Sequence, residues 1–177
     1  MTPADTIDLY GKLTTPDTLE ISRLLPGPIE RVWSWLTESD LRRKWLASGE
    51  MPMVKGAEFT LTWRNDDLTS PPGRRPEGFG EEHSMASRIT GLTPNRRLAF
   101  TWGDNGEVEI TLTPQGDDVL LTLVHKRTRD RLMRLMVGSG WHAHLDILKA
   151  RLEGTTPKPF WDTWQMLRDD YDRRIAA

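Results

Sequence analysis

The sequence predicts an α+β fold in which a curved antiparallel sheet of six or seven strands wraps around one long C-terminal helix, with two short helices after the first strand. Two observations lead to this fold class. A long amphipathic segment lies at residues 130–154, and most of the chain before it alternates between apolar and polar residues in short runs. An amphipathic helix that follows a strand-rich chain must bury its apolar stripe against the apolar face of the sheet.

The first strand and the two short helices are predicted from residues 19–47. Leu19 to Leu25 reads as a strand, and Pro28 suits the first position of a helix whose buried face carries Ile29, Val32, Trp33 and Leu36. A second short helix is expected over residues 40–47, after a polar cap. Its buried face would carry Leu41 and Trp45. Its three basic residues are expected to form a solvated face: Arg42, Arg43 and Lys44.

The meander of strands follows from the change to a period of two after Gly49. Strands are predicted at residues 58–63, 81–89, 98–102, 108–112 and 119–125, with turns at 103–106 and 116–118. Residues 65–80 contain paired prolines and several glycines, so this segment is expected to be a long mobile loop.

The long helix is predicted by an apolar stripe with helical spacing: Trp141, Leu145, Leu148 and Leu152. Gly154 stands where a left-handed C-terminal cap is expected. A pair of glycines, Gly138 and Gly140, should bend or interrupt the helix. A further short helix is expected in the tail. The chain is therefore expected to form a domain over residues 1–154 with a helical extension, 155–177, packed on it.

This order of elements is a helix-grip arrangement, and two motifs resemble a known family. The first motif comprises residues 28–33, Leu36, Thr37 and Trp45; the second comprises residues 140–146, Leu148 and Gly154. Both resemble the family related to the C-terminal domain of the heat-shock protein 90 ATPase activator, which belongs to the START-like (SRPBCC) superfamily of ligand-binding helix-grip domains. The tail also resembles an extension found in some bacterial members.

Composition limits the classes of function. The chain has 177 residues, a formal net charge of −2 and no cysteine, so neither thiolate catalysis nor a cysteine–metal site is available. The charge gives no general attraction to nucleic acid, and no apolar run is long enough to span a membrane. No secretion signal, nucleophile motif or phosphate-binding loop is recognised. A cytoplasmic protein without a cofactor is expected, either a monomer or a homodimer.

A cavity between the sheet and the long helix would be lined by large apolar side chains with a few polar tips. The predicted lining residues are Trp63, His83, Met85, Phe100, Trp102, His125, Trp141, His144 and Leu145. Aromatic walls of this kind suit a flat or hydrophobic small molecule. The alternative is that the same side chains fill a dry core.

The histidines do not predict a metal site. His142 and His144 are two residues apart on a helix, about 200° around its axis, so they cannot bind one ion. His83 or His125 could act as an acid–base group in an enzyme resembling polyketide cyclases. The alternative for each is a buried, neutral, hydrogen-bonded ring.

Three functions are thus compared. The preferred one is a non-catalytic module that binds a small hydrophobic ligand. The second, implied by the family resemblance, is a co-chaperone-like partner of heat-shock protein 90, and the third is the cyclase-like enzyme. The basic segment 126–134 could dock an acidic partner, or it could be a solvated connection paired with acidic residues of the loop or tail.

Overall fold

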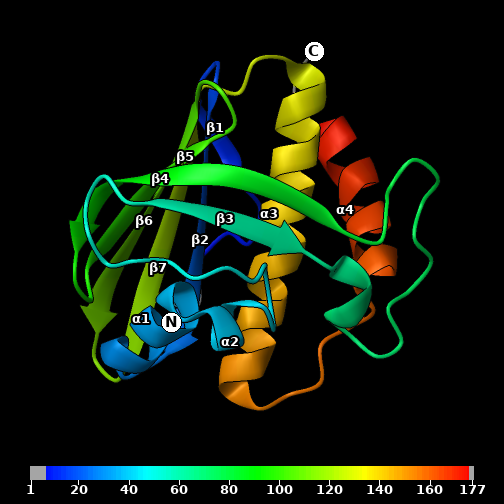
Figure 1. The fold of residues 1–177 in the computed structure, drawn as a ribbon. Coiled ribbons are helices and arrows are strands. Elements are labelled where there is room, and N and C mark those ends of the chain that lie inside the picture. The colour runs from blue at the N-terminus through cyan, green and yellow to red at the C-terminus, as the bar shows by residue number, and fades with distance from the viewer. Residues whose placement is uncertain (1–6, 176–177) are drawn as a thin grey trace.

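The sheet in the computed structural model, which describes residues 7–175, has seven antiparallel strands in the order β1-β2-β7-β6-β5-β4-β3. It curves around the long helix α3, and β3 and β4 cross in front of that helix in Figure 1. The strands are β1 (Lys12–Thr15), β2 (Thr18–Pro26), β3 (Glu58–Trp63), β4 (His83–Thr93), β5 (Arg97–Trp102), β6 (Gly106–Gln115) and β7 (Asp118–Lys126). The predicted fold class is confirmed.

Six of these strands were predicted, and the edge strand β1 was not. It has four residues, three of them exposed, and pairs only with β2. A short solvent-facing edge strand has no apolar alternation, so its sequence reads as a polar, turn-rich segment. Residues 1–6 and 176–177, the outer ends of the two predicted segments, lie outside the described range.

The two short helices are α1 (Ile29–Thr37) and α2 (Ser39–Arg42). Helix α2 ends five residues earlier than predicted, and the chain continues in turns. The expectation of a solvated basic face is wrong for Arg42, which is 2% exposed. Its guanidinium donates to the carbonyl oxygens of four residues: Leu36, Thr37, Ala47 and Gly49. The buried side chain satisfies backbone acceptors at the end of α1 and in the segment after α2.

Helix α3 (Arg131–Glu153) lies in the grip of the sheet. The Asp130 carboxylate accepts the Met133 amide at 2.8 Å and caps the N-terminus, and Gly154 ends the helix in the left-handed conformation with φ of 75°. The predicted stripe is buried throughout. The expected interruption at Gly138 and Gly140 is absent, since the helix is continuous through both glycines.

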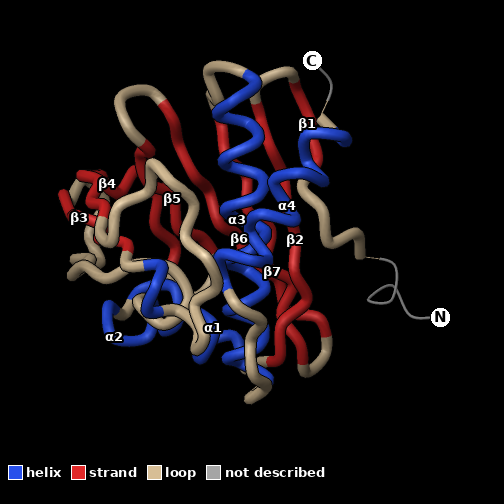
Figure 2. The backbone as a smooth tube through the Cα atoms, turned by 90° about the vertical axis from the view of Figure 1, so that its right-hand side faces the viewer, coloured by secondary structure: helices blue, strands red, loops and turns tan. Residues whose placement is uncertain are grey.

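Helix α4 (Phe160–Arg174) packs along α3, and the two helices run side by side in Figures 1 and 2. The close approach occurs at Gly138, where an added Cβ would lie 3.1 Å from the Tyr171 ring. Because α4 covers the face of α3 that points away from the sheet, His142 is only 4% exposed. Within residues 7–175, no helix is long and apolar enough to cross a membrane.

A network of buried polar side chains links α4, through α3, to β2 on the other side of α3. The Tyr171 hydroxyl accepts the Gly11 amide at 2.6 Å and is hydrogen-bonded to His142 Nδ1 at 3.0 Å. His142 Nε2 lies 3.5 Å from Asp146, whose carboxylate accepts two hydrogen bonds from the buried Arg23 on β2. This network joins four segments without reaching the cavity described below.

Candidate ligand pocket

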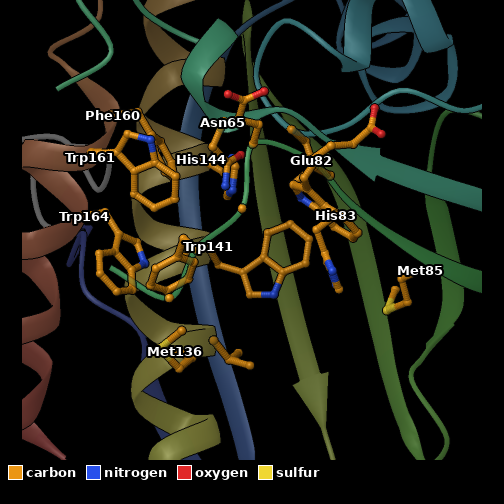
Figure 3. A pocket seen from close by; sticks show the side chains of 18 of the residues that line it. Asn65, Glu82, His83, Met85, Met136, Trp141, His144, Phe160, Trp161 and Trp164 are labelled. Carbon is orange, nitrogen blue, oxygen red and sulfur yellow. The ribbon is translucent and has the colours of Figure 1, made fainter. Parts of the chain in front are cut away.

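A pocket of about 480 Å³ lies where the β3–β5 end of the sheet meets α3 and α4. We call it the aromatic pocket. The strands contribute Trp63, His83, Met85 and Trp102; α3 contributes Met133, Met136, Val137, Gly140, Trp141 and His144; α4 contributes Phe160, Trp161 and Trp164; Leu46, Asn65 and residues 78–82 complete it. Figure 3 shows these side chains converging from the sheet, both helices and the loop.

Five tryptophan rings dominate the lining, in two groups. Trp102 packs against both Trp63 and Trp141, with ring centroids 5.5 and 5.3 Å apart, and these three rings form the side facing the sheet. Trp161 and Trp164 lie 5.9 Å apart on one face of α4. Tilted and edge-to-face arrangements are the preferred geometries of aromatic rings. Such walls accept a flat apolar molecule at little cost in side-chain entropy.

The segment predicted as a mobile loop, residues 65–80, is instead tied to α4. The Thr69 hydroxyl accepts the Phe160 amide at 2.9 Å, and the Pro72 carbonyl accepts the Trp161 amide at 2.9 Å. These bonds satisfy amides at the start of α4 that have no partner within the helix. The Asp66 carboxylate also accepts the Trp161 indole N–H at 2.7 Å. The loop therefore positions the α4 wall of the pocket.

Phe79 closes the pocket from the loop side. Its ring lies 5.3 Å from that of Trp161 and 5.1 Å from that of Trp164. Glu81 and Glu82, which follow Gly80, are exposed and also line the pocket. The lining is thus apolar inside and acidic along this side.

His144 is the most enclosed polar side chain of the pocket, with 6% of its surface exposed. Its Nδ1 lies 2.8 Å from the Trp45 carbonyl oxygen. A carbonyl can only accept, so Nδ1 carries the proton and Nε2 holds a lone pair. Burial lowers the pKa of His144 to about 4, against a smaller opposing effect of the Trp45 carbonyl, and the ring is neutral at neutral pH.

Of the nine residues predicted to line a cavity, the structure brings six together at the aromatic pocket: Trp63, His83, Met85, Trp102, Trp141 and His144. The other three, Phe100, His125 and Leu145, are buried but do not line it. His125 lies behind the wall, where its Nδ1 accepts the Trp141 indole N–H at 3.0 Å. The side chains of these three residues fill core between the sheet and α3.

Sequence reasoning missed the whole wall supplied by α4 and the loop. For Phe160, Trp161 and Trp164 the sequence predicts only a packed helical extension, and it assigns no role to Phe79. The available signal was the density of aromatic residues in the tail, which exceeds what one short surface helix needs for docking. Met133 and Met136 were also missed, although they continue the apolar face of α3.

Comparison with known proteins agrees with this architecture. Residues 26–153 match the family described as activator of Hsp90 ATPase homolog 1-like protein. The solution structure of a protein from Bordetella parapertussis is 36% identical, covers 100% of this chain and 97% of its own, and superposes with a TM-score of 0.80. No curated protein matches the sequence.

Two more distant structures share the fold. CalU16 from Micromonospora echinospora is 24% identical with a TM-score of 0.67, over 90% of this chain and 89% of its own. DynU16, a protein from the dynemicin biosynthetic locus, is 20% identical with a TM-score of 0.64, over 80% of this chain and 49% of its own. From the match over residues 26–153 and the shared helix-grip architecture, the chain belongs to the family of proteins like activator of Hsp90 ATPase homolog 1, within the START-like superfamily.

Proposed function

We propose that this protein is a binding module that encloses a small aromatic or hydrophobic molecule in the aromatic pocket. One observation carries the proposal: five tryptophan side chains line a pocket of about 480 Å³ that holds few polar groups. The volume lies in the range of about 300–1,000 Å³ that small-molecule sites occupy. Rings that served only as core would pack against each other and leave no such space.

We also propose that residues 155–177 are part of the binding unit rather than an accessory to the domain at 1–154. Phe160, Trp161 and Trp164 form one wall, and the loop that caps α4 forms the adjoining one. Without α4, the side of α3 that carries Met136 and Gly140 would face solvent. The extension therefore converts an open groove into a pocket.

Gly140 offers a direct test, because a Cβ added there meets no atom within 4 Å. Gly140→Leu fills the pocket from the helix side, and replacing a helical glycine favours the fold by up to about 1 kcal/mol. The probe is N-phenyl-1-naphthylamine, a neutral aromatic whose fluorescence rises in apolar sites. We expect saturable binding to the wild type and at least tenfold weaker binding to Gly140→Leu.

Gly140→Ala is the matched control, because it gives the same helix preference with one methyl group in the pocket. It should retain most of the binding. Equal affinities for the wild type and Gly140→Leu would overturn the proposal, as would no saturable binding to the wild type. Independently, the native mass of the purified protein can be compared with its denatured mass by mass spectrometry. A surplus native mass would reveal a ligand carried from the cell.

Partnership with a heat-shock protein 90 is the second candidate, favoured by the family to which the chain belongs. In the basic segment 126–134, Lys126 is paired with Glu107 and Arg131 with Asp172 of α4, whereas Arg129 is exposed. A cytoplasmic partner with an acidic surface would meet Arg127 and Arg129. The test is the ATPase rate of the cell's own heat-shock protein 90, with Arg127→Glu/Arg129→Glu as the control. An unchanged rate at saturating protein would exclude activation.

A further inference from the structure

Nε2 of His144 is a deep hydrogen-bond acceptor of the aromatic pocket. The tautomer is set from outside the pocket, since the Trp45 carbonyl requires the proton on Nδ1. Within residues 7–175, Nε2 has no hydrogen-bond partner, and the atom is not fully buried. The lone pair is therefore available to a molecule in the pocket.

The other polar lining groups include further acceptors, while the donors of the lining are the Asn65 amide, His83 and the indole N–H groups. Asn65 Oδ1 is buried without a partner among the described residues, and it too is an acceptor. Glu81 and Glu82 carry the charges, and the described lining includes no lysine or arginine. Glu82 is paired with Arg64 at 3.3 Å, outside the lining. Of the five indole N–H groups, those of Trp141 and Trp161 already donate hydrogen bonds, to His125 and Asp66 respectively.

We infer that the ligand is an uncharged aromatic molecule carrying a hydroxyl group, which donates a hydrogen bond to His144 Nε2. This inference rests on the proposed function and narrows its ligand class. A ligand without a donor would bury the Nε2 lone pair unpaired, which costs free energy. A carboxylate would bring a further acceptor against Nε2 and a negative charge near two glutamates, with no cation in the lining to compensate.

Three naphthalene derivatives of similar size test this class: 2-naphthol, 2-methoxynaphthalene and 2-naphthoate. The first carries a donor, the second replaces it with an ether, and the third is an anion. We expect 2-naphthol to bind wild-type protein roughly three- to tenfold more tightly than the ether, as for one neutral hydrogen bond. The naphthoate should bind more weakly than either. Isothermal titration calorimetry measures all three.

Imidazole nitrogen resonances locate the bond in the wild-type protein. The ¹⁵N signal of an unprotonated ring nitrogen moves upfield when that nitrogen accepts a hydrogen bond. Addition of 2-naphthol should shift Nε2 of His144, whereas saturation with 2-methoxynaphthalene should leave it near its free position. This measurement needs no variant and therefore does not depend on the folding of one.

His144→Phe should remove the preference for the naphthol over the ether, because it keeps a ring and deletes the acceptor. His142→Phe is the matched control: it replaces a buried histidine of the same helix that does not line the pocket, so it should leave the preference intact. Equal affinities of the wild type for naphthol and ether, or tightest binding of the naphthoate, would overturn the inference while leaving the proposed function standing. If none of the three binds although N-phenyl-1-naphthylamine does, the inference fails and the proposed function stands; if none of the four binds, the proposed function itself fails.

Discussion

The indole N–H of Trp141 donates a hydrogen bond to Nδ1 of His125 across 3.0 Å, and both residues are buried. Since Nδ1 accepts, the ring proton is on Nε2, which has no partner in the described chain. Trp102 packs against both rings. His125 thus orients the pocket wall from behind, as a positioning residue that does not itself line the cavity.

Trp141→Phe should destabilise the fold by about 1–3 kcal/mol, because it removes the donor and leaves His125 with an unpaired buried acceptor. Trp141→Ala should cost about 3–5 kcal/mol, since it also removes most of the ring packing. Urea unfolding followed by circular dichroism measures both. The double variant Trp141→Phe/His125→Leu should regain part of the loss of Trp141→Phe. If Trp141→Phe is as stable as the wild type, the hydrogen bond contributes nothing.

Stability should fall as pH drops from about 6.5 towards 4. Burial lowers the pKa values of His125, His142 and His144 to about 4 each, whereas an unfolded histidine has a pKa near 6.5. In this window the unfolded chain binds up to three protons that the folded chain excludes, so protonation favours unfolding. At about 1.4 kcal/mol per proton and pH unit, the steepest slope approaches about 4 kcal/mol per unit.

Urea titrations at intervals between pH 7.5 and 5 measure this slope. His144→Gln should reduce it by about a third, because one of the three buried rings no longer titrates. A free energy of unfolding that is constant between pH 7 and 5 would contradict neutral burial of these histidines.

The two glycines of α3 should respond oppositely to alanine. At Gly138 the new methyl group would lie 3.1 Å from the Tyr171 ring and push α4 away, so we expect Gly138→Ala to destabilise the protein by about 1–3 kcal/mol. At Gly140 the methyl group enters open space, and the helix gains up to about 1 kcal/mol. Thermal unfolding of both variants gives the comparison. A common sign for the two changes would mean that the α3–α4 spacing is not set at Gly138.

Arg42 and Arg43 are adjacent, and their substitution should have very different effects. Arg42→Ala leaves buried carbonyls of Leu36, Thr37 and Ala47 without their donor and should cost about 3 kcal/mol or more. Burial also lowers the pKa of Arg42 to about 10, but the side chain remains charged at neutral pH. Arg43→Ala removes only an exposed side chain 3.7 Å from Asp40 and should change stability by less than about 0.5 kcal/mol. Chemical denaturation distinguishes them; similar losses would argue against the buried position of Arg42.

The sequence predicted most elements because their signals are local. Alternation along residues 58–63 and 119–125, and the stripe through Trp141 and Leu152, depend only on which face of an element is apolar. Asp130 and Gly154 act at their own helix ends, within one turn. The order of these elements then leaves few ways to cover the sheet.

Arg42 shows where such local signals fail. A run of three basic residues is ordinarily solvated, and nothing in the run indicates that four carbonyl oxygens from residues 36–49 converge on the first of them. Gly138 and Gly140 present the same difficulty. Their low helix propensity predicts a break, but α3 is continuous through both, with Gly138 packed against Tyr171 of α4.

What the sequence by itself determined is therefore the helix-grip fold, its family and six of the side chains that meet at the pocket. Only the tertiary structure decided that the pocket lies towards α4, that Phe160, Trp161 and Trp164 form a wall, and that His125 stands behind Trp141. Periodicity specifies the face that an element buries but not which distant segment covers that face. That choice depends on long-range contacts, here the hydrogen bonds between the loop and α4 and the close approach at Gly138.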